Sequence, residues 1–209
     1  YKGVGLYLFN QNYLFDRSNY IQNRIKEIEK KLVKKKIIET KKFKKNNLLI
    51  KKEIKSLENN YILQSDLTID KTFFLSKNNN LIIQPGVKIF FEKDVSIISE
   101  GSITFNGTRD KPITIYSSKG FGSLIFSNND YKFSNVIFKN LSYPKDKNKI
   151  LYAGVNIINS NVEIVDSQII SSNSEDGINL ISSRSNIQNL KVQDIQSDAI
   201  DIDFGTLNF

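Results

Sequence analysis

Three short segments near the end of the chain share one pattern of apolar and polar positions. They cover residues 154–158, 177–181 and 199–203, at offsets of 23 and then 22 residues. In each of them a small residue is followed by an apolar, a polar and an apolar residue. We assign a fourth copy to residues 122–126, 32 residues before the first, in which Ile125 departs from the pattern. Self-similarity with a period of about 20 to 50 residues is typical of solenoids.

The alternation within these segments predicts strands with one buried face. In the first segment Val155 and Ile157 would point inward, whereas Asn156 and Ile158 would point outward. The same register adds four inward positions: Ile178, Leu180, Ile200 and Ile202. A second series, Ser-Asn followed by Val or Ile, begins at residues 134, 160 and 185, at offsets of 26 and 25. We therefore expect each repeat to hold at least two short strands that are separated by corners rich in Ser and Asn.

Strands this short, at this spacing, favour the coils of a parallel β-helix. Leucine-rich repeats have a similar period, but their Leu-x-x-Leu-x-Leu frame is absent here, and a propeller blade needs about 40 residues. One coil cannot bury its own apolar face, so the stacking of neighbouring coils must create the core. The polar stretch 142–149 interrupts the repeat, and we expect it to loop out of one coil as an insertion.

The strand pattern extends back to Tyr61. Residues 81–91 read Leu-x-Ile-x-Pro-Gly-Val-x-Ile-x-Phe, and the Pro-Gly pair predicts a turn because Gly permits a positive φ. With Gly-x-Ile-x-x-x-Gly-Thr at 101–108 and Lys-Pro-Ile-x-Ile at 111–115, this stretch resembles the opening coils of bacterial right-handed parallel β-helix proteins of the pectate-lyase-like superfamily. The resemblance covers residues 61–209. It implies a mainly β fold, a right-handed parallel β-helix solenoid, which is here preceded by a basic α-helical segment.

A second resemblance concerns bacterial surface proteins. Residues 174–179 and 197–204 are similar to β-helix regions that follow spore-coat-kinase-like (CotH-type) domains, and residues 3–7 resemble a late strand of that kinase-like domain. The acidic residue that the family tends to have after this strand is missing from residues 10–12, which are Asn, Gln and Asn. The resemblance implies an extracytoplasmic protein (cell surface, secreted or periplasmic) in which residues 1–16 are the tail end of an upstream domain.

The positive charge of the chain lies in one segment. The chain has a net charge of +8, whereas residues 17–58 hold 15 basic and 5 acidic residues, a net charge of +10. Apolar residues at positions 21, 25, 28 and 32, and again at 50, 54, 57 and 61, predict a basic helical segment over residues 17–60. Its lysines form either a solvated face or a contact with an anionic membrane surface or polysaccharide. We expect no nucleic acid, since no binding motif accompanies them.

The composition limits the available chemistry. The chain has no Cys, His, Met or Trp, which excludes disulfides, thiolate metal sites and Ser-His-Asp triads and removes the commonest general base. It also lacks the stretch of about 18 apolar residues that a transmembrane helix needs. Because the chain begins and ends inside strand patterns, we expect a fragment whose β-helix, residues 61–209, is truncated at its C-terminal end.

Stacking the coils by the repeat offsets gathers polar residues on one outward face. Asn156, Asn179 and Asp201 form one ladder, and Asp203 ends the next. Adjacent rungs are about 4.8 Å apart. One interpretation is structural, because Asn and Asp favour strand ends and turns, where their side chains bond to nearby backbone. Asn156 and Asn179 would otherwise be outward binding positions.

Two chemical interpretations of the acidic residues also remain open. In one, Asp176, Asp198 and Asp201 bind Ca²⁺, a hard cation that takes several oxygen ligands. The resemblance to β-helix lyases then implies an Arg or Lys base, for which Arg184 and Lys191 are the candidates by residue type. In the other, Asp198 with Asp201 or Asp203 forms a glycosidase pair, since carboxyl separations of about 5 to 9.5 Å serve retention or inversion.

These observations predict a non-catalytic surface or secreted module that binds polysaccharide or takes part in envelope assembly. We favour it because no complete set of base, acid and substrate-binding Arg is recognisable in the sequence. Asn156, Asn179, Arg184 and Lys191 would contact the ligand. The alternative is a polysaccharide-active enzyme, a lyase or glycoside hydrolase, that uses the outward Asp residues.

Overall fold

The computed structural model describes residues 23, 26–27, 54–57, 59–145 and 151–208. The chain divides into two compact units, residues 1–48 and 49–209, and the described strands all belong to the second. The predictions for residues 1–16 and for the basic helix up to residue 53 lie outside the described residues, apart from residues 23, 26 and 27, which are helical. Among the described residues, no helix is long and apolar enough to cross a membrane.

The described strands form three sheets. Sheet A holds β1 (Ile54–Leu57), β2 (Asn60–Leu63), β5 (Asn80–Ile83), β8 (Ser102–Asn106), β11 (Asp130–Ser134), β14 (Asn161–Val165), β17 (Arg184–Gln188) and β20 (Thr206–Asn208). Sheet B holds β3 (Leu67–Ile69), β6 (Lys88–Phe91), β9 (Ile113–Ser117), β12 (Val136–Lys139), β15 (Gln168–Ile170) and β18 (Lys191–Gln193). Sheet C holds β4 (Phe73–Leu75), β7 (Ser96–Ser99), β10 (Ser123–Ser127), β13 (Ala153–Ile158), β16 (Asp176–Ile181) and β19 (Ile200–Asp203).

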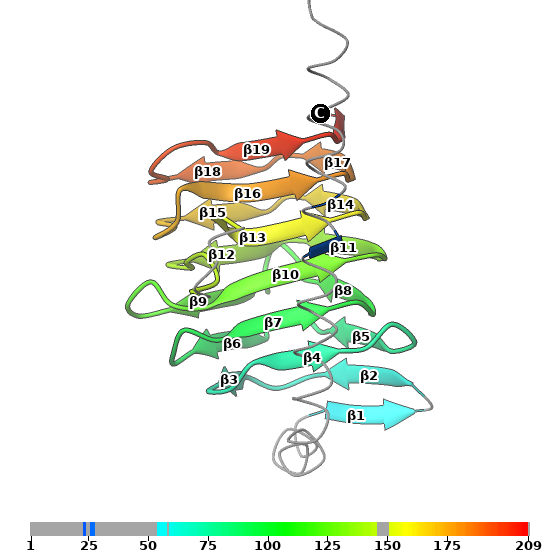
Figure 1. Cartoon of the computed structure of the whole chain (residues 1–209). Helices are drawn as coiled ribbons and strands as arrows, with labels where there is room; N and C mark the ends of the chain where they lie inside the picture. The colour runs from blue at the N-terminus through cyan, green and yellow to red at the C-terminus, as the bar shows by residue number, and fades with distance from the viewer. Residues whose placement is uncertain (1–22, 24–25, 28–53, 58, 146–150, 209) are drawn as a thin grey trace, which may run out of the picture. The chain divides into compact units, whose positions relative to one another are not determined.

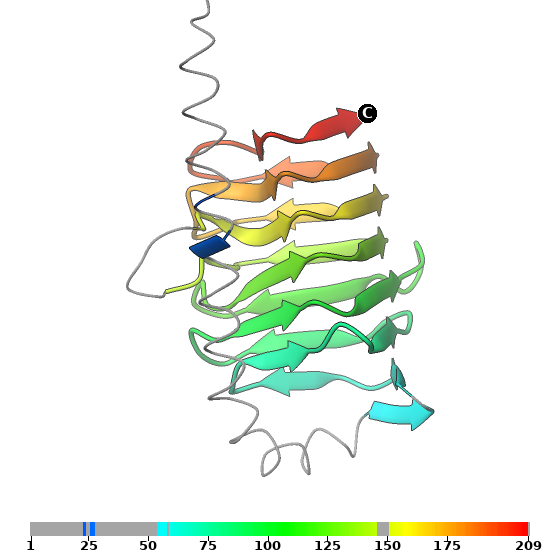
Figure 2. The ribbon, with the colours of Figure 1, turned by 45° about the vertical axis from the view of Figure 1, so that its right-hand side comes forward.

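The described strands build a parallel β-solenoid of about six turns. From β2 onward the chain visits sheets A, B and C in turn, so that neighbours within a sheet are one coil apart and parallel. In Figure 1 the strands of sheet C lie at the front, those of sheet B lie behind them and those of sheet A close the right-hand side. Figure 2 shows the coils stacked one above another. The predicted mainly β solenoid is therefore confirmed.

The core runs along the solenoid axis and contains a column of aromatic rings. The ring centroid of Phe133 lies 4.9 Å from that of Phe105, 5.3 Å from that of Phe126 and 5.8 Å from that of Phe138. All four side chains are at most 1% exposed. Full burial of one such side chain stabilises a fold by about 1.5–3 kcal/mol. The stacking of coils therefore supplies the core that no single coil could bury alone.

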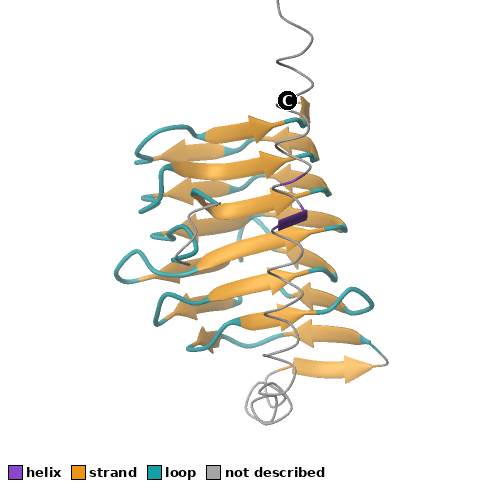
Figure 3. Cartoon of the chain, in the orientation of Figure 1, coloured by secondary structure: helices purple, strands orange, loops and turns teal. Residues whose placement is uncertain are grey.

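The corners repeat residues in the left-handed backbone conformation. Figure 3 shows the loops that join the strands at these corners. Three sets recur from coil to coil: Asn128, Asn159 and Ser182; Asn135, Asp166 and Asn189; Asn140, Ser171 and Asp194. Asn and Asp tolerate this conformation better than most residues because their short polar side chains can bond locally. Nδ2 of Asn159 donates to Oδ1 of Asn128 at 2.8 Å, which links consecutive corners. The corners rich in Ser and Asn are confirmed, as is the turn at Gly86, with a φ of 83°.

The register of sheet C confirms three of the four proposed repeat copies. Val155 pairs with Ile178, which pairs with Ile200. The assignment of the fourth copy is wrong by one residue, because Leu124 pairs with Val155, an offset of 31. Gly122 is small for a different reason: it lies in the corner before β10 with a φ of 75°, and a Cβ there would collide with the ring of Phe91.

The series of Ser-Asn triplets is also wrong as a register. Ser134 ends β11, Ser160 lies just before β14 and Ser185 lies inside β17. Val162 pairs with Ser185 rather than with Ile187. Ser160 belongs to a corner, whereas Ser185 occupies a buried position inside β17, so the recurrence of Ser and Asn does not by itself identify equivalent sites.

The helical prediction is wrong for its last part. Residues 54–57 form strand β1, which pairs antiparallel with β2, with Ile54 opposite Leu63 and Leu57 opposite Asn60. The solenoid unit therefore includes a strand that precedes the predicted boundary at residue 61. Tertiary pairing overrides a weak local helical period, because the edge of β2 offers backbone hydrogen-bond partners to the segment.

The predicted insertion is confirmed by the register. The offset from β10 to β13 is 31 residues and that from β13 to β16 is 23, so the longer turn holds eight additional residues, which fall between β12 and β13. Ser142 forms a parallel bridge with Asn173. Nζ of Lys145 lies 3.4 Å from Oδ2 of Asp94 and 5.7 Å from the ring centroid of Phe121. The described part of the insertion thus follows the corner between sheets B and C.

Candidate functional site

The residues that the sequence proposes for a site lie in three different sheets. Asn156, Asn179, Asp201 and Asp203 occupy outer positions of sheet C, Asp176 begins β16 and Asp198 precedes β19, whereas Arg184 belongs to sheet A and Lys191 to sheet B. The predicted ladder of Asn156, Asn179 and Asp201 is confirmed by the register. The structure does not bring Arg184 or Lys191 into that face.

The two ladder asparagines occupy outer positions of sheet C and are nevertheless buried. Asn156 is 0% exposed and Asn179 is 2% exposed. Nδ2 of Asn156 donates to the carbonyl oxygens of Ala153 (2.7 Å) and Leu124 (3.3 Å), and Nδ2 of Asn179 donates to Oδ2 of Asp201 at 3.0 Å. In the described part of the chain, Oδ1 of each has no hydrogen-bond partner. These bonds support the structural interpretation of the ladder.

The carboxylates at the C-terminal end influence one another. Asp176 is 5% exposed, and its Oδ1 accepts a hydrogen bond from the backbone nitrogen of Asp198 at 3.3 Å. Burial raises the pKa of Asp176 to about 6, although this hydrogen bond opposes the shift. The pKa of Asp201 is also raised, first by burial and then by the charge of Asp203. Among the described residues no group of three or more acidic side chains is arranged to hold a metal ion, so the Ca²⁺ site stays a prediction.

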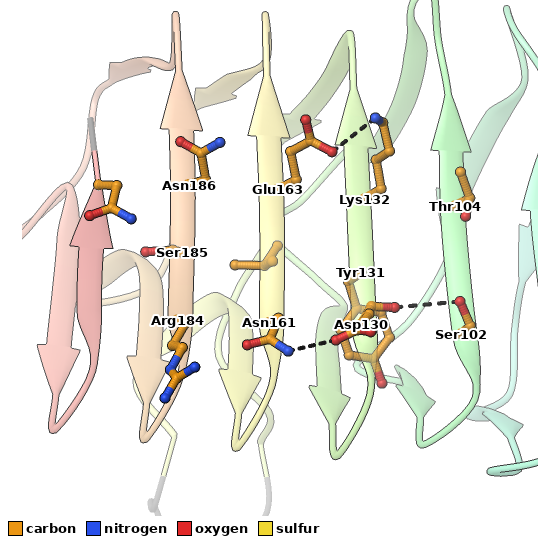
Figure 4. Close-up of a pocket in the computed structure, with 12 residues that line it drawn as sticks. Ser102, Thr104, Asp130, Tyr131, Lys132, Asn161, Glu163, Arg184, Ser185 and Asn186 are labelled. Carbon is orange, nitrogen blue, oxygen red and sulfur yellow. Dashed lines mark hydrogen bonds and ion pairs between the residues drawn. The ribbon is translucent and has the colours of Figure 1, made fainter.

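An open groove lies instead on the outer face of sheet A, where Figure 4 shows two rows of polar side chains that cross neighbouring strands. The first row consists of the first residues of four strands, Ser102, Asp130, Asn161 and Arg184. The second row, two residues further along, consists of Thr104, Lys132, Glu163, Asn186 and Asn208. We call this feature the sheet A groove, and its volume is about 410 Å³.

The local sequence explains why these side chains face outward. In β11 the inward residues Tyr131 and Phe133 are 3% and 0% exposed, which leaves Asp130 and Lys132 on the opposite side of the strand. Successive side chains of a strand point to opposite faces, so every coil with this alternation adds two polar groups to the groove. The groove therefore has a floor formed by five neighbouring strands of a packed sheet.

Contacts between coils hold the groove side chains. Nδ2 of Asn161 donates to Oδ1 of Asp130 at 2.7 Å. Nζ of Lys132 lies 2.8 Å from Oε2 of Glu163, an ion pair whose side chains are 49% and 42% exposed. Arg184 has no hydrogen bond or ion pair from its side chain within the described part of the chain. The groove thus contains one closed ion pair, one anion held by an amide and one open guanidinium.

A second hollow of about 630 Å³ adjoins the groove at the corner between sheets C and A. Both hollows are lined by Asp130, Asn161 and Arg184, and the second also reaches Lys77 and Asn159. Its remaining lining consists of Ser and Asn side chains of the corners. The two hollows form one continuous polar surface that follows the coils along the axis.

The outer face of sheet B carries an aromatic pair that the sequence interpretation overlooked. The ring centroids of Phe90 and Tyr116 lie 5.1 Å apart, and the two residues pair in the register of β6 and β9. Both side chains are partly exposed. The pair lies in a different sheet from the sheet A groove, so it offers a reference surface for experiments.

The sheet A groove was not found from the sequence, although Arg184 was singled out. The signal was present in the alternation of residues 130–134, 161–165 and 184–188. Aligning these segments requires offsets of 31 and 23, which differ because of the insertion after β12. No protein family, no curated protein and no solved structure was found to match the chain. The groove must therefore be interpreted from its own chemistry.

Proposed function

We propose that the solenoid is a non-catalytic, extracytoplasmic module of a bacterial surface or secreted protein, and that it binds polysaccharide in the sheet A groove. The observation that carries this proposal is the double row of polar side chains on one rigid, open sheet face. Asn, Asp, Glu, Lys and Arg together supply donors and acceptors that match the hydroxyl groups of sugars. The coils repeat at about 4.8 Å, which suits a linear polymer that also repeats.

The contacts within the groove favour binding over catalysis. Glu163 is held by Lys132, and Asp130 by Asn161, so neither carboxylate is directed to an isolated reaction centre. Pre-organised polar groups on a rigid sheet lower the entropic cost of binding a ligand. The proposal includes the right-handed sense of the coil, which is supported by the strong preference for right-handed connections between parallel strands. It is also supported by Figure 1, in which the front strands of sheet C point to the right while the chain rises from β2 to β19.

The proposal is tested by measuring binding of the full chain to a panel of bacterial polysaccharides by affinity electrophoresis and titration calorimetry. The groove variant combines Asn161→Ala with Asn186→Ala. The matched control combines Gln168→Ala with Gln193→Ala, which removes two amides from the outer face of sheet B in the adjoining strands β15 and β18. Loss of two hydrogen bonds of about 1 kcal/mol each should weaken binding by at least about tenfold in the groove variant alone.

Two results would contradict the proposed function. One is the absence of binding to every polysaccharide in the panel. The other is an equal loss of affinity in the groove variant and the sheet B control, because it would place the ligand elsewhere or indicate a general effect on folding. Thermal unfolding of both variants, followed by circular dichroism, distinguishes these cases.

An enzyme remains the second candidate, because one observation favours it. A carboxyl group with a raised pKa is suited to donate a proton near neutral pH, and the pKa of Asp176 is raised to about 6. The predicted catalytic residues Asp198, Asp201 and Asp203 lie near it in sequence and register. The test measures new reducing ends and unsaturated products from a bound polysaccharide, with and without Ca²⁺. Activity that is lost in Asp201→Asn but kept in Asn186→Ala would favour the enzyme.

A further inference from the structure

The charges of the sheet A groove are not all matched. Lys132 and Glu163 neutralise each other across 2.8 Å. Asp130 receives only the amide of Asn161, at 2.7 Å, and takes part in no ion pair within the described residues. Arg184 has neither a hydrogen bond nor an ion pair from its side chain in that same part of the chain. One anion and one cation in the groove are therefore left for a ligand.

The two unmatched charges occupy one row and are separated by one amide. Asp130, Asn161 and Arg184 begin the neighbouring strands β11, β14 and β17, and the register pairs Asp130 with Asn161 and Asn161 with Arg184. The Cα atoms of Asp130 and Arg184 are thus about 10 Å apart, which is two strand spacings. All three side chains are exposed and line both hollows. Within the described residues no ion pair joins the side chains of Asp130 and Arg184, so both charges stay available to a ligand.

An unmatched carboxylate and an unmatched guanidinium favour different groups of a ligand. A carboxylate accepts hydrogen bonds from an ammonium group, whereas the planar fork of a guanidinium binds a carboxylate through two parallel bonds. A ligand with a single sign of charge would be attracted by one of the two residues and repelled by the other. Complementary charges chiefly determine which ligand is chosen.

We infer that the sheet A groove selects zwitterionic glycans, in which an ammonium group contacts Asp130 and a carboxylate contacts Arg184. This inference rests on the proposed function and adds the chemical class and direction of the ligand. The ammonium group lies toward the earlier coils and the carboxylate toward the later ones. The amides of Asn161 and Asn186 bind the hydroxyl groups between and beside these charges.

The experiment uses one oligosaccharide of alternating glucuronate and glucosamine in four forms. The parent is zwitterionic, N-acetylation removes the positive charge, reduction of the carboxyl group removes the negative charge, and both treatments give a neutral form. Each form is titrated into the full chain and into the variants Asp130→Asn and Arg184→Gln. Asp130→Asn keeps the size of the side chain while removing its charge. Arg184→Gln removes the charge and leaves a shorter side chain that ends in a neutral amide.

The expected result is a pattern of matched losses. For the unmodified protein, either treatment weakens binding by about tenfold, since each removes one charge-assisted contact. In Asp130→Asn, N-acetylation has no further effect, whereas carboxyl reduction still weakens binding. In Arg184→Gln, carboxyl reduction has no further effect, whereas N-acetylation still weakens binding. Lys139→Gln, which alters an exposed cation of β12 in sheet B, keeps both preferences.

Three outcomes would overturn the inference. The first is equal binding of all four forms by the unmodified protein, which would leave the proposed function intact. The second is a preference for one sign of charge alone. The third is an effect of N-acetylation that is the same in Asp130→Asn as in the unmodified protein. Failure of all four forms, together with failure of the polysaccharide panel, would instead contradict the proposed function itself.

Discussion

Asn161 donates a hydrogen bond from Nδ2 to Oδ1 of Asp130, 31 residues earlier in the chain and one coil away, at 2.7 Å. Both residues are exposed and belong to the first row of the sheet A groove. The bond fixes the orientation of a carboxylate that the proposed ligand contacts. It therefore links the stacking of coils directly to the candidate binding surface.

We predict that Asn161→Ala separates binding from stability. The lost bond lies at the surface, so the free energy of unfolding should fall by no more than about 0.5–1.5 kcal/mol. Glycan affinity should fall by about tenfold, because the Asp130 side chain loses its fixed orientation. Urea denaturation and calorimetric titration measure the two quantities. A large loss of stability with unchanged affinity would contradict the role given to this bond.

Ile178→Asp should abolish cooperative folding of the solenoid. Ile178 is 0% exposed and points into the core between Val155 and Ile200 of the adjacent coils. An unpaired buried charge costs several kcal/mol. This is a large part of the free energy of unfolding of a typical domain, which is about 5–15 kcal/mol. The far-ultraviolet circular dichroism signal during heating measures the transition. An unchanged cooperative transition would show that the position does not face the core, and Asn186→Asp on the outer face provides the control.

Asp201→Ala should destabilise the fold more than Asp203→Ala. Asp201 accepts a hydrogen bond from Nδ2 of the buried Asn179 at 3.0 Å, so its removal leaves a buried donor without a partner. Such a loss costs about 1–3 kcal/mol. Equal midpoints of urea denaturation for the two variants would contradict this prediction.

The stability of the solenoid should decrease as the pH rises from about 4 to about 6. The pKa of Asp176 is about 6 in the folded chain, above its ordinary value of 3.8. Because the folded state binds this proton more tightly, its contribution to stability is complete below the ordinary value and is lost as the pH passes the raised one. The contribution should be about 1–3 kcal/mol.

The replacement of Asp176 by Asn tests this pH dependence. Asp176→Asn removes the titrating group and should remove that part of the stability change between about pH 4 and pH 6. Asp110→Asn, at an exposed position outside the strands, should keep it. The free energy of unfolding is measured by urea denaturation across the pH range. The same pH dependence in both variants would assign the effect to other groups.

Gly101→Ala should lower stability because the backbone of another coil lies too close. A Cβ at this position would be 2.4 Å from the carbonyl oxygen of Asn79 and 2.6 Å from that of Ser76. Overpacking of this kind costs about 1–3 kcal/mol. Ser102→Ala, at the next position and on the outer face, should have a much smaller effect. Equal denaturation midpoints for the two variants would show that the coil shifts to accept the methyl group.

The sequence by itself determined the solenoid and the inner face of its later coils. The alternation at 154–158 and 177–181 marks Val155 and Ile178 as core residues, because strand side chains alternate between faces whatever the rest of the fold does. The offsets of 23 and 22 also determined the ladder that ends at Asp201. The helical prediction over residues 17–53 stays a prediction.

Only the tertiary structure decided the site. Asp130, Asn161 and Arg184 become neighbours through offsets of 31 and 23, and the eight residues inserted after β12 make the first offset unreadable from the local pattern. The burial of Asn156 and Asn179 also follows from packing rather than from strand alternation. Alternation tells which face a residue occupies, but the register between coils and the burial of that face depend on contacts between distant parts of the chain.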